Sequence, residues 1–182
     1  MKKNSGLALL FPAVAVFAVA AALCLTCSIH PVQVQVQVQV QAASDPIAVI
    51  VNSANPVDNL TLSDLKKLFL SDRSRWDTGK AVAPVILTAG APERTAFLRI
   101  VCNMNDGSFS NYFVQAAFSG KSVTPPKEVS SAAALKSFVA VSPGAIGFVK
   151  AGDFHGDNSD GAIRTVKIDG AATADAAYKI RM

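Results

Sequence analysis

Runs of apolar and β-branched residues recur along the chain after residue 45 and predict its strands. Residues 46–51 read Pro-Ile-Ala-Val-Ile-Val and residues 82–87 read Val-Ala-Pro-Val-Ile-Leu, without the polar alternation of a half-exposed strand. Such runs are typical of strands that are buried on both faces of a sheet. Similar runs predict two further strands at residues 145–149 and 163–168.

Between these runs, apolar residues recur at a spacing of three and four residues, which predicts helices. The first predicted helix spans residues 62–70. It follows Thr61 and has Asp64 three residues after that threonine, which is the pattern of a capping box. Further helices are predicted at residues 92–103, 109–119, 129–139 and 173–180. Strands that alternate with helices indicate an α/β fold with a mixed sheet flanked by helices.

The first 42 residues differ in character from the rest of the chain. Two lysines precede an apolar run at residues 7–26, and five Val-Gln repeats occupy residues 32–41. A basic start and an apolar run are typical of a secretory signal peptide, and the repeats are of low complexity. We therefore expect residues 1–42 to be a signal peptide with a low-complexity Val-Gln tail, and residues 43–182 to be one domain of a periplasmic or secreted protein.

Two alternatives for the first residues stay open. The apolar run is about 20 residues long, which is enough to span a bilayer, so a retained membrane anchor competes with a cleaved signal. Cleavage after Ser28 competes with cleavage after Ala42.

Composition gives no indication of nucleic-acid binding or of an internal disulfide. Residues 43–182 hold 15 of the 17 basic residues and all 13 acidic ones, and they contain no basic stripe interleaved with aromatic residues. Nucleic-acid binding is therefore not indicated. Only Cys102 lies after residue 42, so this domain has no internal disulfide, and we expect the thiol to be buried in an apolar helix.

No motif indicates an enzyme or a cofactor. The sequence contains no paired carboxylates, no glycine-rich nucleotide loop and no zinc-ligand spacing. Residues 153–161 (Asp-Phe-His-Gly-Asp-Asn-Ser-Asp-Gly) place oxygen ligands at alternate positions, a pattern that also occurs in calcium and transition-metal loops. This segment lacks the final bidentate glutamate and the flanking helices of an EF-hand, and we interpret it as a solvated loop without a metal.

The stretch from Leu87 to Phe97 is the strongest candidate for binding chemistry. It joins a predicted strand, a turn of small residues and the start of a predicted helix at Pro92. The first N–H groups of a helix have no partners within the helix, and they carry the positive end of its dipole. Such a turn can bind an anion, although the same pattern also fits an ordinary connection between a strand and a helix.

Several residues, taken in order, carry a resemblance to a known family. They are Leu60-Thr61-Leu62, Leu65, Leu68-Phe69, Trp76, Gly79, Pro84-Val85, Gly90, Phe97 and Pro143-Gly144-Ala145-Ile146-Gly147-Phe148-Val149. This succession resembles the phosphate-binding protein of bacterial phosphate ABC transporters. More closely, it resembles short secreted proteins that keep little more than one lobe of that two-lobed, periplasmic-binding-protein-type fold. The resemblance covers residues 47 to about 168, and its most specific piece is the Pro-Gly-Ala-Ile-Gly-Phe-Val run.

The resemblance also implies a ligand site. In the family, the turn that matches residues 87–94 holds phosphate with an arginine and a Ser-Gly-Thr triplet; here Leu87 stands at the place of the arginine and Ala91 at that of the serine. The groups that could still bind an anion are backbone N–H groups, hydroxyls and the guanidinium of Arg94. The start of the predicted helix at residues 129–139, at Ser130 and Ser131, matches a second region of the family, where a helix N-terminus faces the ligand cleft. The implied ligand-binding residues are Thr88, Gly90, Arg94, Ser130 and Ser131.

The sequence thus leads to three hypotheses about function. The first is a single periplasmic-binding-protein-like lobe that binds a small anion, phosphate first, in transport or sensing, with an ABC transporter or another envelope protein as partner. The second is a non-catalytic protein-interaction module that has lost ligand binding, which Leu87 and Ala91 favour. The third is a membrane-anchored sensor domain, which requires that the first 26 residues stay attached.

Overall fold

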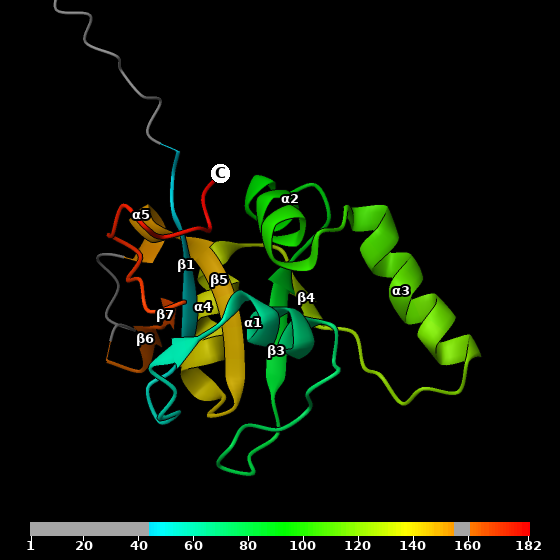
Figure 1. The fold of residues 1–182 in the computed structure, drawn as a ribbon. Coiled ribbons are helices and arrows are strands. Elements are labelled where there is room, and N and C mark those ends of the chain that lie inside the picture. Colours follow the sequence, from blue (N-terminus) through cyan, green and yellow to red (C-terminus); the bar gives the residue numbers. More distant parts are fainter. Residues whose placement is uncertain (1–43, 155–160) are drawn as a thin grey trace, which may run out of the picture. The chain divides into compact units, whose positions relative to one another are not determined.

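The computed structural model describes residues 44–154 and 161–182 (Figure 1). The predicted signal peptide, its Val-Gln tail and residues 155–160 of the predicted solvated loop lie outside the described residues. In the described part of the chain, no helix is both long enough and apolar enough to cross a bilayer.

A mixed sheet forms the centre of the described domain. Its strands are β1 (Ile47–Asn52), β3 (Ala83–Leu87), β4 (Lys127–Val129), β5 (Ala145–Lys150) and β6 (Ile163–Thr165). They are ordered β4-β3-β5-β1-β6. The strands β4, β3 and β5 run parallel, whereas β1 is antiparallel to both of its neighbours. The predicted α/β class with a mixed sheet is confirmed.

Helices cover both faces of this sheet (Figure 1). On one face lie α1 (Leu62–Phe69) and α2 (Pro92–Phe97), which continues as the π-helix η1 (Leu98–Cys102); on the other lies α4 (Ala132–Val141). Alternate residues of β1 pack into the hydrophobic cores on the two faces of the sheet, and all six residues of the strand are buried. This explains the continuous apolar run at this strand, since both of its faces meet helices.

The capping box that begins α1 is present as predicted. The Thr61 hydroxyl accepts a hydrogen bond from the N–H of Asp64 at 3.0 Å, and the Asp64 carboxylate accepts one from the N–H of Thr61 at 3.2 Å. Helix α1 packs onto the sheet through an aromatic cluster, in which the rings of Phe97 and Phe148 stack with centroids 3.9 Å apart. Cys102 lies in this core, and its burial raises the pKa of the thiol to about 11.

Glycines in the Pro-Gly-Ala-Ile-Gly-Phe-Val run are required by close packing. A Cβ on Gly144 would lie 2.0 Å from the carbonyl oxygen of Ala81, and a Cβ on Gly147 would lie 2.6 Å from a methyl of Leu135 in α4. The Gly144 carbonyl also accepts a hydrogen bond from Nε1 of Trp76 at 2.9 Å. The most specific piece of the sequence resemblance is therefore a packing motif around β5.

Helix α3 (Asp106–Phe118) lies to one side of the sheet in Figure 1. Asn105 caps its start by accepting a hydrogen bond from the N–H of Ser108. Phe109 and Phe113 are buried against the rest of the domain, whereas Phe118 is 89% exposed.

Three sequence predictions about elements require correction. Residues 163–168 form two strands, because the chain leaves β6 and pairs β7 (Lys167–Ile168) with β2 (Asn59–Leu60) in a separate two-stranded sheet. The predicted helix 129–139 begins only at Ala132, because the chain after Pro125-Pro126 is extended and residues 127–129 join the sheet edge as β4.

The predicted terminal helix at residues 173–180 does not form. This segment is irregular and packs against the start of β1: the N–H of Ile47 donates to the carbonyl of Ile180 at 2.9 Å, and the Tyr178 hydroxyl donates to the carbonyl of Ile47 at 2.7 Å. A short helix is marginal without tertiary packing of its own, so these contacts with β1 decide the conformation. Burial also raises the pKa of Tyr178 to about 12.

Candidate anion-binding site at the strand ends

The carboxyl ends of two parallel strands bring together four of the five predicted ligand residues. Leu87 of β3 lies opposite Val129 of β4, and the N–H of Thr88 donates to the carbonyl of Val129 at 2.9 Å. The turn at Thr88–Gly90 therefore lies beside Ser130–Ser131. All four of these residues are exposed. The carboxyl ends of parallel strands are where ligands bind in open α/β sheets.

Helix α4 adds a dipole to this edge. Ser131 is its N-cap, and the hydroxyl accepts a hydrogen bond from the N–H of Ala134 at 3.2 Å. The N–H groups of Ala132 and Ala133 belong to the same first turn, where the helix itself supplies no acceptor. The ten residues of α4 place the positive end of the dipole next to Ser130.

The start of α2 is chemically different. Its N-cap is Ala91, which makes no side-chain hydrogen bond, and Pro92 in the first turn has no N–H. Glu93 follows, and its carboxylate forms an ion pair with Lys150 at the end of β5, with Nζ 3.4 Å from Oε1. Gly90 has φ +91, and nothing lies within 4 Å of a Cβ placed on it. The turn at Gly90 is therefore open, and the ion pair of Glu93 with Lys150 lies at the helix start that follows it.

Arg94, the fifth predicted ligand residue, lies inside the domain and is 1% exposed. Its Nη1 donates to the carbonyl of Leu87 at 2.7 Å and to Oε1 of Glu128 at 2.6 Å, and its Nε donates to Oδ1 of Asp106 at 2.5 Å. The guanidinium also lies 5.9 Å from the centroid of the Phe109 ring. Internal acceptors therefore hold the guanidinium of Arg94, which the sequence resemblance implied as a ligand-binding group.

Sequence reasoning missed the partners of Arg94 and the pair at β5. Glu128 lies 34 residues after Arg94, and Lys150 lies 57 residues after Glu93. No local pattern marks such pairs, since they form only when the strands assemble. A cavity of about 220 Å³ is lined in part by Arg94, Glu128 and Phe109, and its lining includes none of the exposed hydroxyls at the strand ends.

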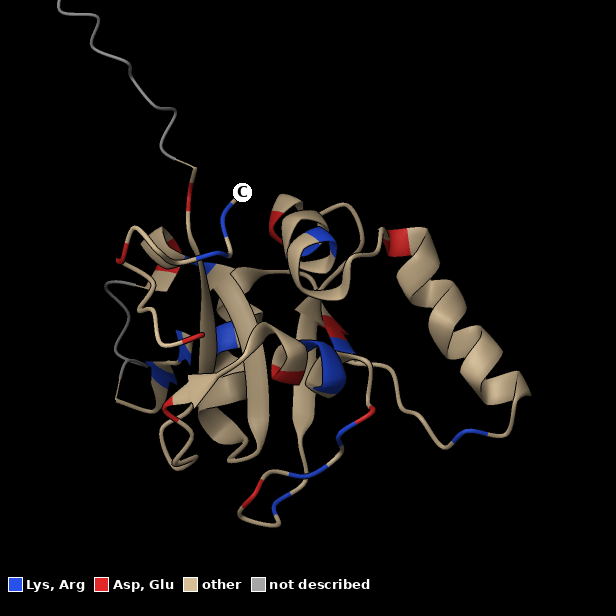
Figure 2. Ribbon diagram, in the orientation of Figure 1, with Lys and Arg blue, Asp and Glu red and all other residues tan. Residues whose placement is uncertain are grey.

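Charge is dispersed over the domain. Figure 2 shows lysine and arginine interspersed with aspartate and glutamate along the described ribbon, without a continuous basic strip. Among the residues that the structure describes, no three histidine, cysteine or carboxylate side chains converge as they would around a metal ion.

Comparison with known proteins identifies the fold. No family model matches the sequence. A phosphate ABC transporter substrate-binding protein from Clostridium perfringens, solved with bound phosphate, is 24% identical, with a TM-score of 0.55 over 71% of this chain and 47% of that one. An ABC-type phosphate transport receptor from Vibrio cholerae is 23% identical, with a TM-score of 0.56 over 71% of this chain and 48% of that one.

A third structure, PstS from Borrelia burgdorferi, is 12% identical, with a TM-score of 0.61 over 75% of this chain and 54% of that one. This chain therefore spans about half the length of the three solved proteins. Its fold is that of a periplasmic-binding-protein-like lobe. The likeness to substrate-binding proteins of phosphate ABC transporters, which the sequence predicted, is confirmed at the level of the fold.

Proposed function

We propose that this protein is a non-enzymatic, solute-binding-like protein of the periplasm or the secreted fraction, which binds a small anion, phosphate first. The observation that carries the proposal is the meeting of Thr88–Gly90 with Ser130–Ser131 at adjacent parallel strand ends, beside the start of α4. The solved proteins of like fold that are described as phosphate-binding or phosphate transport proteins support this choice of ligand.

In this proposal, the exposed hydroxyls and the first turn of α4 both contact the bound anion. Thr88 and Ser130 donate hydrogen bonds, while the N–H groups of Ala132 and Ala133 stabilise the negative charge. Arg94 acts as a positioning residue, since it bonds the carbonyl of Leu87 immediately before the turn. Because the edge is open to water, we expect a dissociation constant on the order of millimolar.

Calorimetric titration of the purified protein with phosphate tests this proposal. The double variant Thr88→Val with Ser130→Ala removes both hydroxyls from exposed positions, and Ser137→Ala removes an exposed hydroxyl elsewhere on α4. We expect the double variant to weaken binding about fivefold or more, and the control to leave it unchanged. Equal binding by the two variants would contradict the proposed site.

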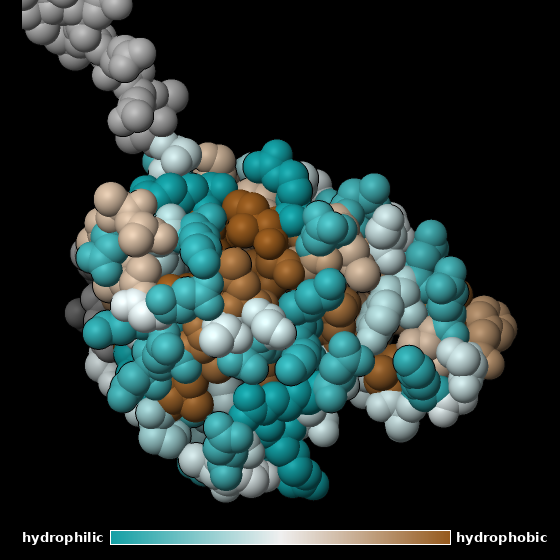
Figure 3. Space-filling model, in the orientation of Figure 1, coloured by the Kyte–Doolittle hydropathy of each residue, from teal (hydrophilic) through white to brown (hydrophobic). Residues whose placement is uncertain are grey.

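The interaction module remains a second candidate because specific observations favour it. Arg94 is held internally, Glu93 is acidic, and Leu87 is buried at the place where the resemblance implies an arginine. Figure 3 shows apolar side chains at the surface of the face that α1 and α2 cover, and on α3 Val114 is 52% exposed. A folded protein that takes up no phosphate at tens of millimolar would favour this module over anion binding.

The proposal includes secretion of the protein and an envelope protein as its partner. A soluble form that works with an ABC transporter or another envelope protein requires removal of the apolar segment at residues 7–26. Intact-mass measurement of the exported protein tests this: an N-terminus near Ala43 supports a periplasmic or secreted protein. A mass that includes residues 1–26 supports the membrane-anchored sensor domain instead.

A further inference from the structure

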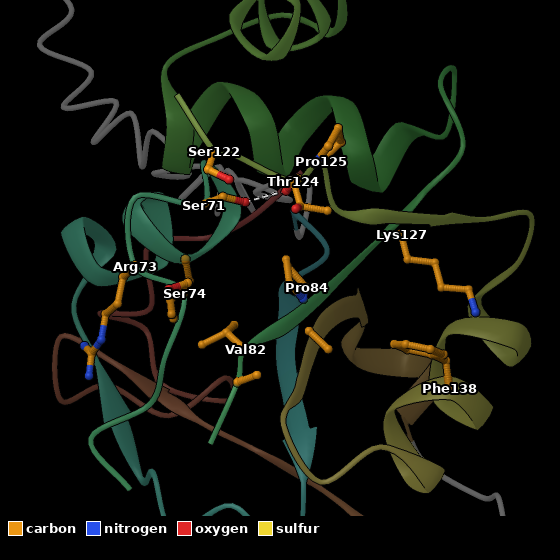
Figure 4. A pocket seen from close by; sticks show the side chains of 13 residues that line it. Ser71, Arg73, Ser74, Val82, Pro84, Ser122, Thr124, Pro125, Lys127 and Phe138 are labelled. Carbon is orange, nitrogen blue, oxygen red and sulfur yellow. Dashed lines mark hydrogen bonds between the residues drawn. The ribbon is translucent and has the colours of Figure 1, made fainter. Parts of the chain in front are cut away.

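A cavity of about 410 Å³ lies at the opposite, amino-terminal ends of β3 and β4 (Figure 4). Its apolar lining includes Leu68, Val82, Pro84 and Phe138, while hydroxyl side chains line another part of it. Figure 4 shows Ser71, Ser122 and Thr124 together on one side, Lys127 and Phe138 together on another, Pro84 between them, and Val82 near Ser74. The volume is within the range of about 300–1,000 Å³ that is typical of small-ligand sites.

The two positively charged side chains that line this cavity differ in whether a carboxylate already pairs with them. Arg73 and Lys127 are the two cationic residues of its lining, which contains no carboxylate. The Arg73 guanidinium is paired with Asp77 and lies 4.0 Å from Asp64. The Lys127 ammonium lies 4.3 Å from the centroid of the Phe138 ring, and no carboxylate of the described residues forms an ion pair with it. One cation therefore remains for a ligand.

The hydroxyl side of the cavity is fixed by a bond between two loops. The Ser71 hydroxyl donates to the carbonyl of Thr124 at 2.5 Å, which joins the end of α1 to the segment before β4. Ser71 has φ +59, a conformation that is uncommon for a residue with a side chain. The cavity thus has one fixed polar side, an apolar floor and one ammonium beside an aromatic ring.

We propose that this cavity binds a small organic anion with one carboxylate head and a short apolar body. The carboxylate pairs with Lys127, and the body packs on Phe138 and Val82. The apolar floor distinguishes this ligand from inorganic phosphate, which has no apolar body to bury. The single available ammonium selects one negative charge. Because the cavity lies at the other end of β3 and β4, this proposal stands or fails independently of the proposed anion site.

Titration of the purified protein with hexanoate, 1-hexanol and inorganic phosphate, followed by calorimetry, tests the cavity. We expect hexanoate to bind with a dissociation constant on the order of millimolar and to bind more tightly than 1-hexanol. Lys127→Glu should weaken hexanoate binding about fivefold or more, because it reverses the charge at the head group. Lys121→Glu, at an exposed residue outside the lining, should leave binding unchanged.

Several results would overturn the proposal. They are equal affinity for hexanoate and 1-hexanol, an equal effect of the two lysine variants, and no saturable binding of hexanoate. If Lys127→Glu fails to give the native fluorescence of Trp76, Lys127→Gln replaces it, since glutamine removes the charge without reversing it. A Lys127→Gln variant that binds hexanoate as tightly as the unaltered protein would also overturn the proposal.

Discussion

Arg94 connects its own helix to three other elements of the domain through one guanidinium. It connects α2 to the end of β3, to β4 through Glu128 and to the start of α3 through Asp106. Both carboxylates are partly exposed, with side-chain exposures of 52% for Glu128 and 30% for Asp106. Loss of the guanidinium therefore leaves these carboxylates accessible to water, while the carbonyl of Leu87 loses its buried donor.

Replacement of Arg94 should consequently affect stability more than ligand selection. We expect Arg94→Ala to lower the free energy of unfolding by about 2–4 kcal/mol, because it removes a buried side chain, the donor to the buried carbonyl of Leu87 and two part-buried charge-assisted hydrogen bonds. Urea unfolding followed by the fluorescence of Trp76 measures this change. Arg99→Ala alters an exposed arginine of η1 and should stay within about 0.5 kcal/mol. Equal stability of the two variants would show that the contacts of Arg94 do not stabilise the fold.

Gly144 provides a second test at the scale of one residue. We expect Gly144→Ala to destabilise the domain by about 3 kcal/mol, because its Cβ would overlap the backbone carbonyl of Ala81. Gly152→Ala in α5 (Ala151–Phe154) is the matched control, since nothing lies within 4 Å of a Cβ there. Thermal unfolding of both variants measures the difference, and a Gly144→Ala protein as stable as the control would contradict the packing account.

Asp64 should make stability dependent on acid pH. The hydrogen bond from the Thr61 hydroxyl lowers the pKa of Asp64 below its ordinary value of 3.8. A carboxyl with a lowered pKa in the folded state stabilises the fold above the unfolded pKa, and this contribution is lost as the pH falls through the folded pKa. We expect stability to decline below about pH 4, and Asp64→Asn to reduce that decline.

The matched control for Asp64→Asn is Asp45→Asn, which changes an exposed carboxylate before β1. Urea unfolding at several pH values between about 2 and 6 compares the variants. At neutral pH, Asp64→Asn should cost about 1 kcal/mol, because it weakens the capping box. An Asp64→Asn variant whose stability falls with pH as steeply as that of the Asp45→Asn control would show that the Asp64 carboxylate is not responsible.

At the scale of elements, α3 differs from the strands in how it is held. The strands β1 and β5 are buried in the centre of the sheet, whereas α3 is anchored on one side by Phe109, Phe113 and Ala116. We expect the amides of α3 to exchange with solvent faster than those of β1 and β5, because local opening of α3 exposes little apolar surface. Hydrogen-exchange mass spectrometry measures this, and equal protection of helix and strands would contradict it.

Local pattern predicted the elements whose signals are complete within a few residues. The apolar runs predicted β1, β3 and β5, and Thr61 with Asp64 predicted the start of α1. The prediction was wrong where a distant segment decides the conformation. Tyr178 and Ile180 pack on β1, and Lys167–Ile168 pairs with a strand that lies more than 100 residues earlier.

The same distinction applies to the candidate site. The sequence could predict that Thr88–Gly90 follows a strand and that Ser130–Ser131 lies near the start of a helix, because both are local patterns, although it placed that start before the serines. It could not predict that Glu128 and Asp106 hold Arg94, since that depends on how β4 and α3 pack around α2. The sequence thus placed the turn correctly, while the surroundings of its one arginine required the structure.

At the scale of the whole domain, β3 and β4 have a different proposed ligand at each end. Their carboxyl ends present hydroxyls and the start of α4, and their amino ends line the cavity with Lys127 and Phe138. Inorganic phosphate suits the first, because it needs hydrogen-bond donors and no apolar contact. A carboxylate with an apolar body suits the second. The two sites can therefore be distinguished by where each ligand changes the protein.

Amide NMR during a phosphate titration shows whether phosphate binds, as proposed, at the carboxyl ends of β3 and β4. We expect the largest chemical-shift changes at residues 88–91 and 130–133, with saturation at millimolar phosphate. Saturable shift changes confined to other residues, or no shift changes from a folded protein at tens of millimolar phosphate, would rule out phosphate binding at these strand ends.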